Sequence, residues 1–155
     1  MTKTPYICGP LTEMPEELKG PARALYTRIA DICGEELGER GYCPHEHSDP
    51  HAHETLTPAE VYAIDARQVG EFCNLLIVVA IAPSWGGGME VEIAHQNQVP
   101  ILILKPKNKK VSRCMLGNPS VREVIEYSDA KEAEELTRTA IRRILTVFPT
   151  PTMSR

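Results

Sequence analysis

The chain has 155 residues, of which 42% are hydrophobic and 25% charged, a composition typical of a single globular domain. Its 17 Lys and Arg against 21 Asp and Glu give a formal net charge of −4, which argues against binding of nucleic-acid polymers or anionic membranes. The longest apolar run, residues 75–82, is too short to span a bilayer, and no secretory signal precedes it. We expect a cytoplasmic protein with one domain over residues 1–148 and a flexible tail over 149–155.

The cysteines are odd in number and widely spaced, and they form no CxxC pair; they are Cys8, Cys33, Cys43, Cys73 and Cys114. Several lie beside apolar, strand-like residues, where a reduced thiol behaves as a small hydrophobic group. We expect free structural thiols in a reducing compartment, and a catalytic or redox cysteine is the alternative.

Short apolar runs alternate with helical patterns, which is typical of a parallel α/β sheet. Strands are predicted at 5–8, 41–44, 74–81, 100–104 and 121–127, and helices at 21–37, 57–72, 89–98 and 129–147. Thr57, Pro58 and Glu60 form a capping-box signal, and Asp129 is the expected cap of the last helix. The five strands predict a doubly wound, flavodoxin-like sandwich of three layers, in which ligands bind beyond the carboxyl ends of the strands.

A glycine-rich segment, residues 83–88, follows the strongest strand and is predicted to be a loop. Its glycines allow close approach of the backbone to a ligand, and the N-terminus of the next helix favours phosphate or a carboxylate. The segment lacks the GK[ST] of a P-loop, and an ordinary strand-to-helix turn is the alternative. Gly9 ends the first strand at the same edge of the sheet, which is the predicted site.

Two glutamates follow this segment, and helical spacing separates them. Glu90 shares a stripe with Ile93, Ala94 and Asn97, whereas Glu92 aligns with polar residues. Glu90 is therefore the better candidate for an inward carboxylate. The alternative is that both glutamates only favour the helix dipole.

Asp65 falls on the apolar stripe of its helix, between Val61 and Val69. A carboxylate there needs partners, because an unpaired buried charge is costly or shifts its pKa. It is predicted either to bind a loop backbone or to face a ligand.

Two further segments carry charge or metal-binding side chains. The histidines His45, His47, His51 and His53 lack an established ligand spacing, so we expect a solvated or substrate-edge loop rather than a metal site, and no cofactor. The lysine-rich run at 105–110, with Arg113, is expected to be solvated. Its alternative role is to steer an anionic substrate toward a strand end.

A set of residues in order resembles the nucleoside 2-deoxyribosyltransferase family, and most closely its 2'-deoxynucleoside 5'-monophosphate N-glycosidases (deoxynucleotide N-hydrolases). The resemblance spans residues 5–127 and rests on Tyr6-Ile7-Cys8-Gly9, the segment Arg23-Ala24-Leu25-Tyr26-Thr27-Arg28-Ile29, Glu46-His47, Asp65, Pro83-Ser84-Trp85-Gly86, Glu90, Ala94, Pro100 and Val111-Ser112.

The resemblance implies retaining chemistry at the anomeric carbon of a nucleoside or nucleotide. Glu90 would be the nucleophile, since Gly86 and Ala94 bracket it as in the family. Tyr6 would orient it, and Asp65 would contact the sugar or base and assist departure of the base. Ser84 and the amides of residues 86–88 would hold the 5'-phosphate or 5'-oxygen, with Gly9, Gly86, Gly88 and His47 in the binding site.

The resemblance also implies a homodimer with shared sites, because a serine at the position of Ser112 reaches the phosphate of the neighbouring subunit in the hydrolases. This chain departs from them in its first loop, where Pro10 and Leu11 stand in place of phosphate-binding residues and Thr12 or Lys19 would substitute. A base-exchanging deoxyribosyltransferase and a non-catalytic nucleotide sensor are the alternatives.

Overall fold

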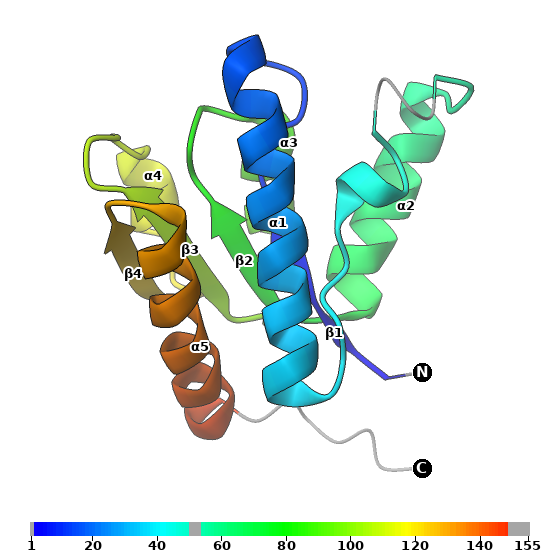
Figure 1. The fold of residues 1–155 in the computed structure, drawn as a ribbon. Coiled ribbons are helices and arrows are strands. Elements are labelled where there is room, and N and C mark those ends of the chain that lie inside the picture. The colour runs from blue at the N-terminus through cyan, green and yellow to red at the C-terminus, as the bar shows by residue number, and fades with distance from the viewer. Residues whose placement is uncertain (1, 50–53, 149–155) are drawn as a thin grey trace, which may run out of the picture.

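The computed structural model describes residues 2–49 and 54–148, and its centre is a parallel sheet of four strands (Figure 1). In chain order the strands are β1 (Thr4–Cys8), β2 (Cys73–Val79), β3 (Ile101–Pro106) and β4 (Val121–Tyr127), and each pairs with the next. The longer helices are α1 (Glu16–Leu37), α2 (Pro58–Glu71), α3 (Trp85–Gln96) and α5 (Ala130–Val147). Two short helical segments, η1 (Pro44–Glu46) and α4 (Arg113–Leu116), complete the fold.

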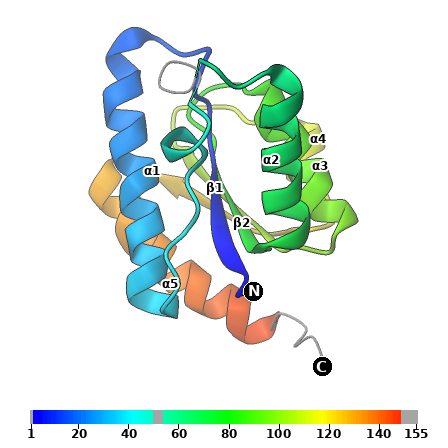
Figure 2. The same ribbon diagram turned by 90° about the vertical axis from the view of Figure 1, so that its right-hand side faces the viewer.

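The helices cover both faces of the sheet, which makes three layers and confirms the predicted α/β class (Figure 2). Helices α1 and α5 pack on one face, against alternate strand residues such as Ile7, Ile77 and Leu102. Helices α2 and α3 pack on the other face, against Tyr6, Cys8 and the remaining strand residues. Because successive strand residues point to opposite faces, the central strands β2 and β3, with helices on both sides, are largely apolar.

The prediction of a fifth strand at 41–44 is wrong. Only Tyr42 pairs with β1: its N–H donates to the Pro5 carbonyl at 2.8 Å, and its carbonyl accepts from the Ile7 N–H at 2.9 Å. Pro44 has no backbone N–H to extend such a ladder, and it begins η1 instead. A single bridge therefore stands where a strand was expected.

Two helices, α1 and α3, begin earlier in the chain than predicted. Helix α1 begins at Glu16 rather than residue 21, with Glu16 and Glu17 in the first turn, where carboxylates favour the helix dipole, and Pro21 lies inside the helix. Helix α3 begins at Trp85 rather than residue 89, so that the predicted glycine loop forms its first turn. The capping box of Thr57 and Glu60 and the Asp129 cap are confirmed.

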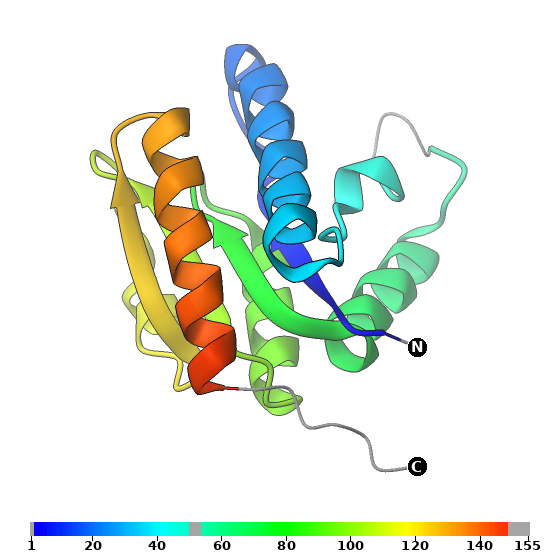
Figure 3. The same ribbon diagram turned by 60° about the horizontal axis from the view of Figure 1, so that its bottom comes forward.

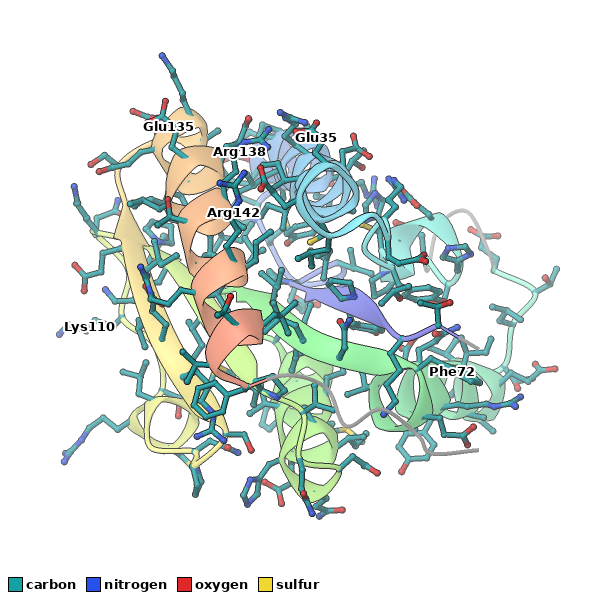
Figure 4. All side chains as sticks on the ribbon, turned by 90° about the horizontal axis from the view of Figure 1, so that it is seen from below. Glu35, Phe72, Lys110, Glu135, Arg138 and Arg142 are labelled. Atoms are coloured by element: carbon teal, nitrogen blue, oxygen red, sulfur yellow. The ribbon has the colours of Figure 1, made fainter. Side chains whose placement is uncertain are left out.

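Charged side chains join α1 to α5, which lie side by side over the sheet (Figure 3). Arg138 and Arg142 of α5 face Glu35 of α1 in Figure 4. Arg138 bonds to both Glu35 and Glu36, and Arg142 bonds to Glu36. This network lies away from the sheet face that carries α2 and α3.

The five cysteines are free, as predicted: four are buried and Cys114 is exposed. Within the described part of the chain, no helix is both long enough and apolar enough to cross a bilayer. The predicted tail at 149–155, together with His51 and His53, lies outside the described residues.

The loop after β1 depends on a close approach at Gly9. A Cβ built on Gly9 would lie 2.5–2.6 Å from the ring and hydroxyl of Tyr26, and the Tyr26 hydroxyl donates to the Pro10 carbonyl at 2.9 Å. The buried Tyr26 ring therefore fills the space that any side chain at position 9 would need.

We expect Gly9→Ala to lower the free energy of unfolding by about 2–3 kcal/mol, because overpacking must displace the Tyr26 ring. Urea denaturation measures the change. Gly20→Ala in α1 is the matched control: a Cβ there meets nothing within 4 Å, and the substitution should stabilise the helix by about 0.5–1 kcal/mol. A Gly9→Ala protein as stable as the wild type would contradict the role assigned to this contact.

Candidate active site

The first turn of α3 brings that helix close to β1. Ser84 caps the helix, because its hydroxyl oxygen accepts a hydrogen bond from the Gly87 N–H at 3.1 Å. A Cβ on Gly87 would lie 3.2 Å from the Cys8 Sγ, so glycine allows the helix to sit directly against the strand. This approach places the second turn of α3, which carries Glu90, over the side chains of β1.

Glu90 is bonded to Tyr6 of β1. The Tyr6 hydroxyl donates to the Glu90 Oε1 at 2.5 Å, and the Tyr6 side chain is only 1% exposed. Glu92, two residues later, is exposed, and its carboxylate accepts a hydrogen bond from Gln96 at 3.2 Å. The Glu90 carboxyl is therefore directed toward β1 and the Glu92 carboxyl toward solvent, which is the difference that the helical stripe predicts.

Burial is the main influence on the Glu90 carboxyl. Desolvation raises its pKa to about 7, while the Cys8 thiol and the Tyr6 hydroxyl oppose this rise and the Asp65 charge adds to it. Burial also raises the pKa of the Cys8 thiol well above its usual range, so Cys8 stays protonated, and its thiol donates to the Gly87 carbonyl at 4.0 Å. Cys8 lies two residues after Tyr6, on the same face of β1, and that period-2 spacing is a signal for its place that sequence reasoning missed.

Asp65 of α2 is the second carboxyl at this place. Desolvation raises its pKa to about 6, and the Tyr6 hydroxyl acts on this pKa in the opposite direction. Its Oδ1 atom is buried and has no hydrogen-bond partner among the described residues. Within residues 2–49 and 54–148, no group therefore serves as the partner that a carboxylate on this stripe needs at its Oδ1.

Both carboxyls open into one cavity of about 460 Å³ between α2 and α3. Its walls are mainly apolar, with Ser48 and Glu54 as the other polar residues; the remaining lining residues are Leu56, Pro58, Val61, Tyr62, Ala66, Gly86, Met89 and Ile93. The volume and the convergence of a few polar groups in an apolar cleft are typical of a small-molecule site.

The rings of Tyr6, Tyr42 and His47 form a stack that leads outward from the site. The Tyr42 ring lies 5.4 Å from the Tyr6 ring at 19°, and the His47 ring lies 4.5 Å from the Tyr42 ring at 11°. His47, a predicted binding residue, is exposed at the outer end of this stack and does not line the cavity of the carboxyls. Sequence reasoning missed Tyr42, because only its single bridge to β1 brings it beside Tyr6.

Apart from Gly86, the remaining predicted binding residues line a second cavity of about 650 Å³ beyond the carboxyl ends of β1 and β2. Gly9, Ser84, Gly88 and Ser112 all border it, together with the exposed side chains of Lys109 and Lys110. The first turn of α3 separates the two cavities: Gly86 borders the first, and Gly87 and Gly88 border the second.

The predicted glycine amides are only partly available to a ligand. The Gly87 N–H donates to the Ser84 hydroxyl, and the Gly88 N–H donates to the Ser84 carbonyl at 3.2 Å. Residues 85 and 86 are the first two of the helix, where N–H groups have no partner within the helix itself. The amides left available to a ligand are therefore those of Trp85 and Gly86, rather than those of residues 86–88.

No cluster of three or more His, Cys, Asp or Glu side chains arranged for a metal ion occurs in residues 2–49 and 54–148. In the histidine segment, the His45 ring nitrogen lies 3.3 Å from the Thr27 hydroxyl, and Asp49 is paired with Arg23 at 2.6 Å.

Comparison with known proteins gives one curated relative and several similar folds. No family model matches the chain. A Methanosarcina mazei protein named "Putative 2'-deoxynucleoside 5'-phosphate N-hydrolase 1" is 33% identical over 101 residues, which are 63% of this chain and 62% of that protein. The chain thus matches about three-fifths of that relative's length. The relative's name lies within the family that the sequence resembles, so the resemblance is confirmed.

Two solved structures share the fold at low identity. A CMP N-glycosidase of Clostridium botulinum superposes with a TM-score of 0.62 and 18% identity, over 86% of this chain and 97% of that one. A 2-deoxyribosyltransferase of Bacillus psychrosaccharolyticus superposes with a TM-score of 0.59 and 14% identity, over 84% and 89% of the two chains. Both likenesses establish the α/β arrangement of this chain.

We expect Glu90→Gln to stabilise the protein at alkaline pH. The folded state raises the Glu90 pKa from its usual 4.5 to about 7, so the folded chain binds this proton more tightly than the unfolded chain. The free energy of unfolding therefore falls by at most about 3 kcal/mol as the pH rises from about 4.5 to about 7. It does not recover above pH 7. A glutamine can still accept the Tyr6 hydrogen bond and carries no charge, so at pH 8 the variant should be more stable by about 2–3 kcal/mol.

Urea denaturation at pH 5 and pH 8 measures this difference. Glu92→Gln is the control: that side chain is exposed, and its substitution should change stability by less than about 0.5 kcal/mol at either pH. An equal effect of Glu90→Gln at both pH values would show that the Glu90 carboxylate is not desolvated.

Proposed function

We propose that the chain is an N-glycosidase that hydrolyses the base–sugar bond of (deoxy)nucleoside 5'-monophosphates through a covalent glycosyl–Glu90 intermediate. The observation that carries the proposal is the Glu90 carboxyl, bonded to Tyr6 at 2.5 Å and sharing one small cavity with Asp65. The name of the curated relative, a deoxynucleoside 5'-phosphate N-hydrolase, supports it, as does the name of the CMP N-glycosidase with the same fold.

The charge of the cavity suits a cationic transition state. Cleavage of a glycosidic bond develops positive charge at the anomeric carbon and the ring oxygen. Glu90 and Asp65 are both acids, and the groups that act on their pKa are neutral hydroxyl and thiol donors or each other, with no Lys or Arg among them. Negative charge without a neighbouring cation in an apolar cavity stabilises such a transition state strongly.

In the first step, an oxygen of the ionised Glu90 attacks C1' of the sugar while the bond from C1' to the base nitrogen breaks. Asp65, whose pKa is raised by burial, gives its proton to the departing base. In the second step a water attacks C1', Asp65 takes the proton of that water, and Glu90 is released as a carboxylate. Two inversions at C1' retain the configuration of the sugar.

The second cavity provides the proposed place for the phosphate. Lys109 and Lys110 attract an anion to it and outweigh the one carboxylate in its lining, Glu92, and the Ser84 hydroxyl and the Trp85 amide supply hydrogen-bond donors. Because Glu90 lies one turn further along α3, a sugar held at Glu90 would extend its 5' end toward this helix terminus. In the proposed homodimer, the exposed Ser112 of one copy is available to the site of the other.

A panel of nucleosides and 5'-monophosphates, each with and without a second base, tests the reaction and the substrate class together. We expect release of free base and sugar phosphate from monophosphates, with no exchange of bases, measured by chromatography of the products. Base exchange on unphosphorylated nucleosides would instead show a deoxyribosyltransferase. Nucleotide binding with no turnover would show a sensor.

The Glu90→Ala protein should lose base release by at least about 10³-fold, because the group that forms the covalent intermediate is gone. Glu92→Ala is the comparison on the same helix: the Glu92 carboxylate is exposed and lies outside the cavity of Asp65, so kcat for base release should be retained, and because Glu92 borders the second cavity its removal should act on KM alone. Loss of activity in Glu92→Ala but not in Glu90→Ala would show that Glu92, and not Glu90, is the nucleophile.

We expect the pH profile of kcat/KM to be bell-shaped, with limbs near pH 6 and pH 7. The two carboxyls together hold one proton between their pKa values of about 6 and about 7; the higher pKa of Glu90 places that proton mainly on Glu90, and the reactive form is the minor one that carries it on Asp65. Below this range no nucleophile is ionised, and above it no acid is left for the base. Asp65→Asn should remove the alkaline limb along with most of the activity, and a flat wild-type profile from pH 5 to 8 would exclude this pair of roles.

A further inference from the structure

Two large apolar side chains remain exposed at the cavity that holds both carboxyls. Tyr62 of α2 is 55% exposed and Met89 of α3 is 52% exposed, and both line this cavity. Exposed apolar side chains are ordinary where they occur singly, whereas a pair at one cavity that already holds the candidate catalytic groups marks a binding surface. The pair therefore indicates a ligand that brings apolar surface of its own.

The two side chains come from opposite walls of this cavity. Helices α2 and α3 lie side by side on one face of the sheet and form these walls (Figure 2). On α2, Tyr62 lies three residues before Asp65, and on α3, Met89 lies four residues before Ile93. Both spacings place two side chains on one face of a helix, and all four residues line the cavity. A flat group that enters the cavity would therefore meet Tyr62 on one side and Met89 on the other.

The carboxyls lie deeper in the cavity than this pair. The Asp65 Oδ1 is buried, and Glu90 is bonded to Tyr6, which is 1% exposed. Tyr62 and Met89, in contrast, are each more than half exposed. The cavity therefore runs from an apolar mouth to an acidic floor.

The connectivity of a nucleotide decides which part of it reaches this mouth. The base is attached at C1' and the phosphate is carried by C5', on opposite sides of the ring oxygen of the sugar. With C1' at Glu90 and the phosphate in the second cavity, beyond the first turn of α3, the base is the part directed into the first cavity. Trp85 is 94% exposed, but it borders the second cavity and so lies on the side of the phosphate.

We propose that Tyr62 and Met89 hold the two faces of the substrate's base, with the Tyr62 ring stacked on one face and the Met89 thioether packed against the other. This inference rests on the proposed function, because the ligand is the nucleotide of that reaction. Every nucleobase has two π faces, and stacking on an aromatic side chain is independent of the hydrogen-bonding edge of the base. The polarisable sulfur of methionine also packs favourably against an aromatic ring. The pair thus supplies affinity for a base and leaves the choice among bases to the groups at its edge.

Steady-state kinetics of base release test the role of Tyr62. We expect Tyr62→Ala to raise KM for a nucleoside 5'-monophosphate by about tenfold or more, because the stacking contact with the base is lost. The value of kcat should stay close to that of the wild type, since this contact is made equally in the ground state and the transition state. Tyr62→Phe should keep the wild-type KM, because its ring retains the stacking face.

Two kinetic outcomes would overturn the proposal. One is an unchanged KM in Tyr62→Ala. The other is an equal rise of KM in Tyr62→Ala and Tyr62→Phe, which would show that the hydroxyl rather than the ring meets the substrate. Leu136→Ala is the matched control, since this apolar side chain is also exposed, at 37%, and belongs to α5 on the other face of the sheet. Its KM should equal that of the wild type.

A second measurement reads the contact with Met89 and needs no turnover. The Glu90→Gln protein, labelled with ¹³C at its methionine methyl groups, is titrated with a nucleoside 5'-monophosphate. The Met89 methyl resonance, assigned with Met89→Leu, should move upfield, because a methyl group above the face of an aromatic base lies in the shielding region of its ring current. The corresponding sugar 5-phosphate, which lacks the base, should leave this resonance in place.

Met115 is the reference within the same spectrum, because it lines the second cavity and should show no upfield shift that depends on the base. A Met89 methyl resonance indifferent to the base would overturn the proposal. A resonance that responds to protein concentration instead of nucleotide would also overturn it, since a second copy of the chain would then cover the pair.

These measurements separate the inference from the function on which it rests. Failure of the wild-type protein to release base from any nucleotide would end the proposed function, whatever the Met89 resonance shows. A wild-type enzyme that hydrolyses nucleotides, with an unchanged KM in Tyr62→Ala and a Met89 methyl indifferent to the base, would keep the proposed function and end this inference alone.

Discussion

The hydrogen bond from Tyr6 to Glu90 joins the two elements on which the candidate site depends, strand β1 and helix α3. Its donor is buried within the sheet face, whereas the two carboxyls are half-buried at the wall of a cavity, and desolvation is the main influence on the pKa of both. The glycine at position 87 makes this possible by letting the helix approach Cys8. A site of this kind is costly to the folded state, since a carboxylate kept from water and from cations is an unfavourable group to bury. Such strain at a functional site is a known compromise between stability and activity.

The fold divides the chemistry between two cavities on either side of the first turn of α3. The cavity of Glu90 and Asp65 is acidic and apolar, whereas the second cavity carries Lys109 and Lys110 against the single carboxylate of Glu92, together with two serine hydroxyls. A nucleotide has the matching polarity, with an anionic phosphate at one end of the sugar and an anomeric carbon that becomes cationic during cleavage. The opposite charges of the two cavities therefore provide a physical basis for orienting a substrate of this class along α3.

How much of this was predictable can be traced to particular residues. The apolar runs at 74–81 and 121–127, the Thr57 capping box and the Asp129 cap depend on local preferences, and these elements formed where they were expected. The first turn of α3 was misjudged because glycine disfavours helix, while the Ser84 cap and the packing on Cys8 outweigh that preference. The segment at 41–44 was misjudged for the converse reason: its residues favour a strand, but Pro44 cannot continue a ladder.

By itself the sequence determined the α/β class and favoured Glu90 over Glu92 as the inward carboxylate, because periodicity and capping act over a few residues. It also carried a family resemblance in the order of its motifs. Only the tertiary structure decided that Tyr6 reaches Glu90 across 84 positions of chain, that the Asp65 Oδ1 lacks a partner, and that Tyr42 stacks on Tyr6. These facts depend on how closely strands and helices approach one another, which is set by packing between distant segments and leaves no periodic signal in the chain.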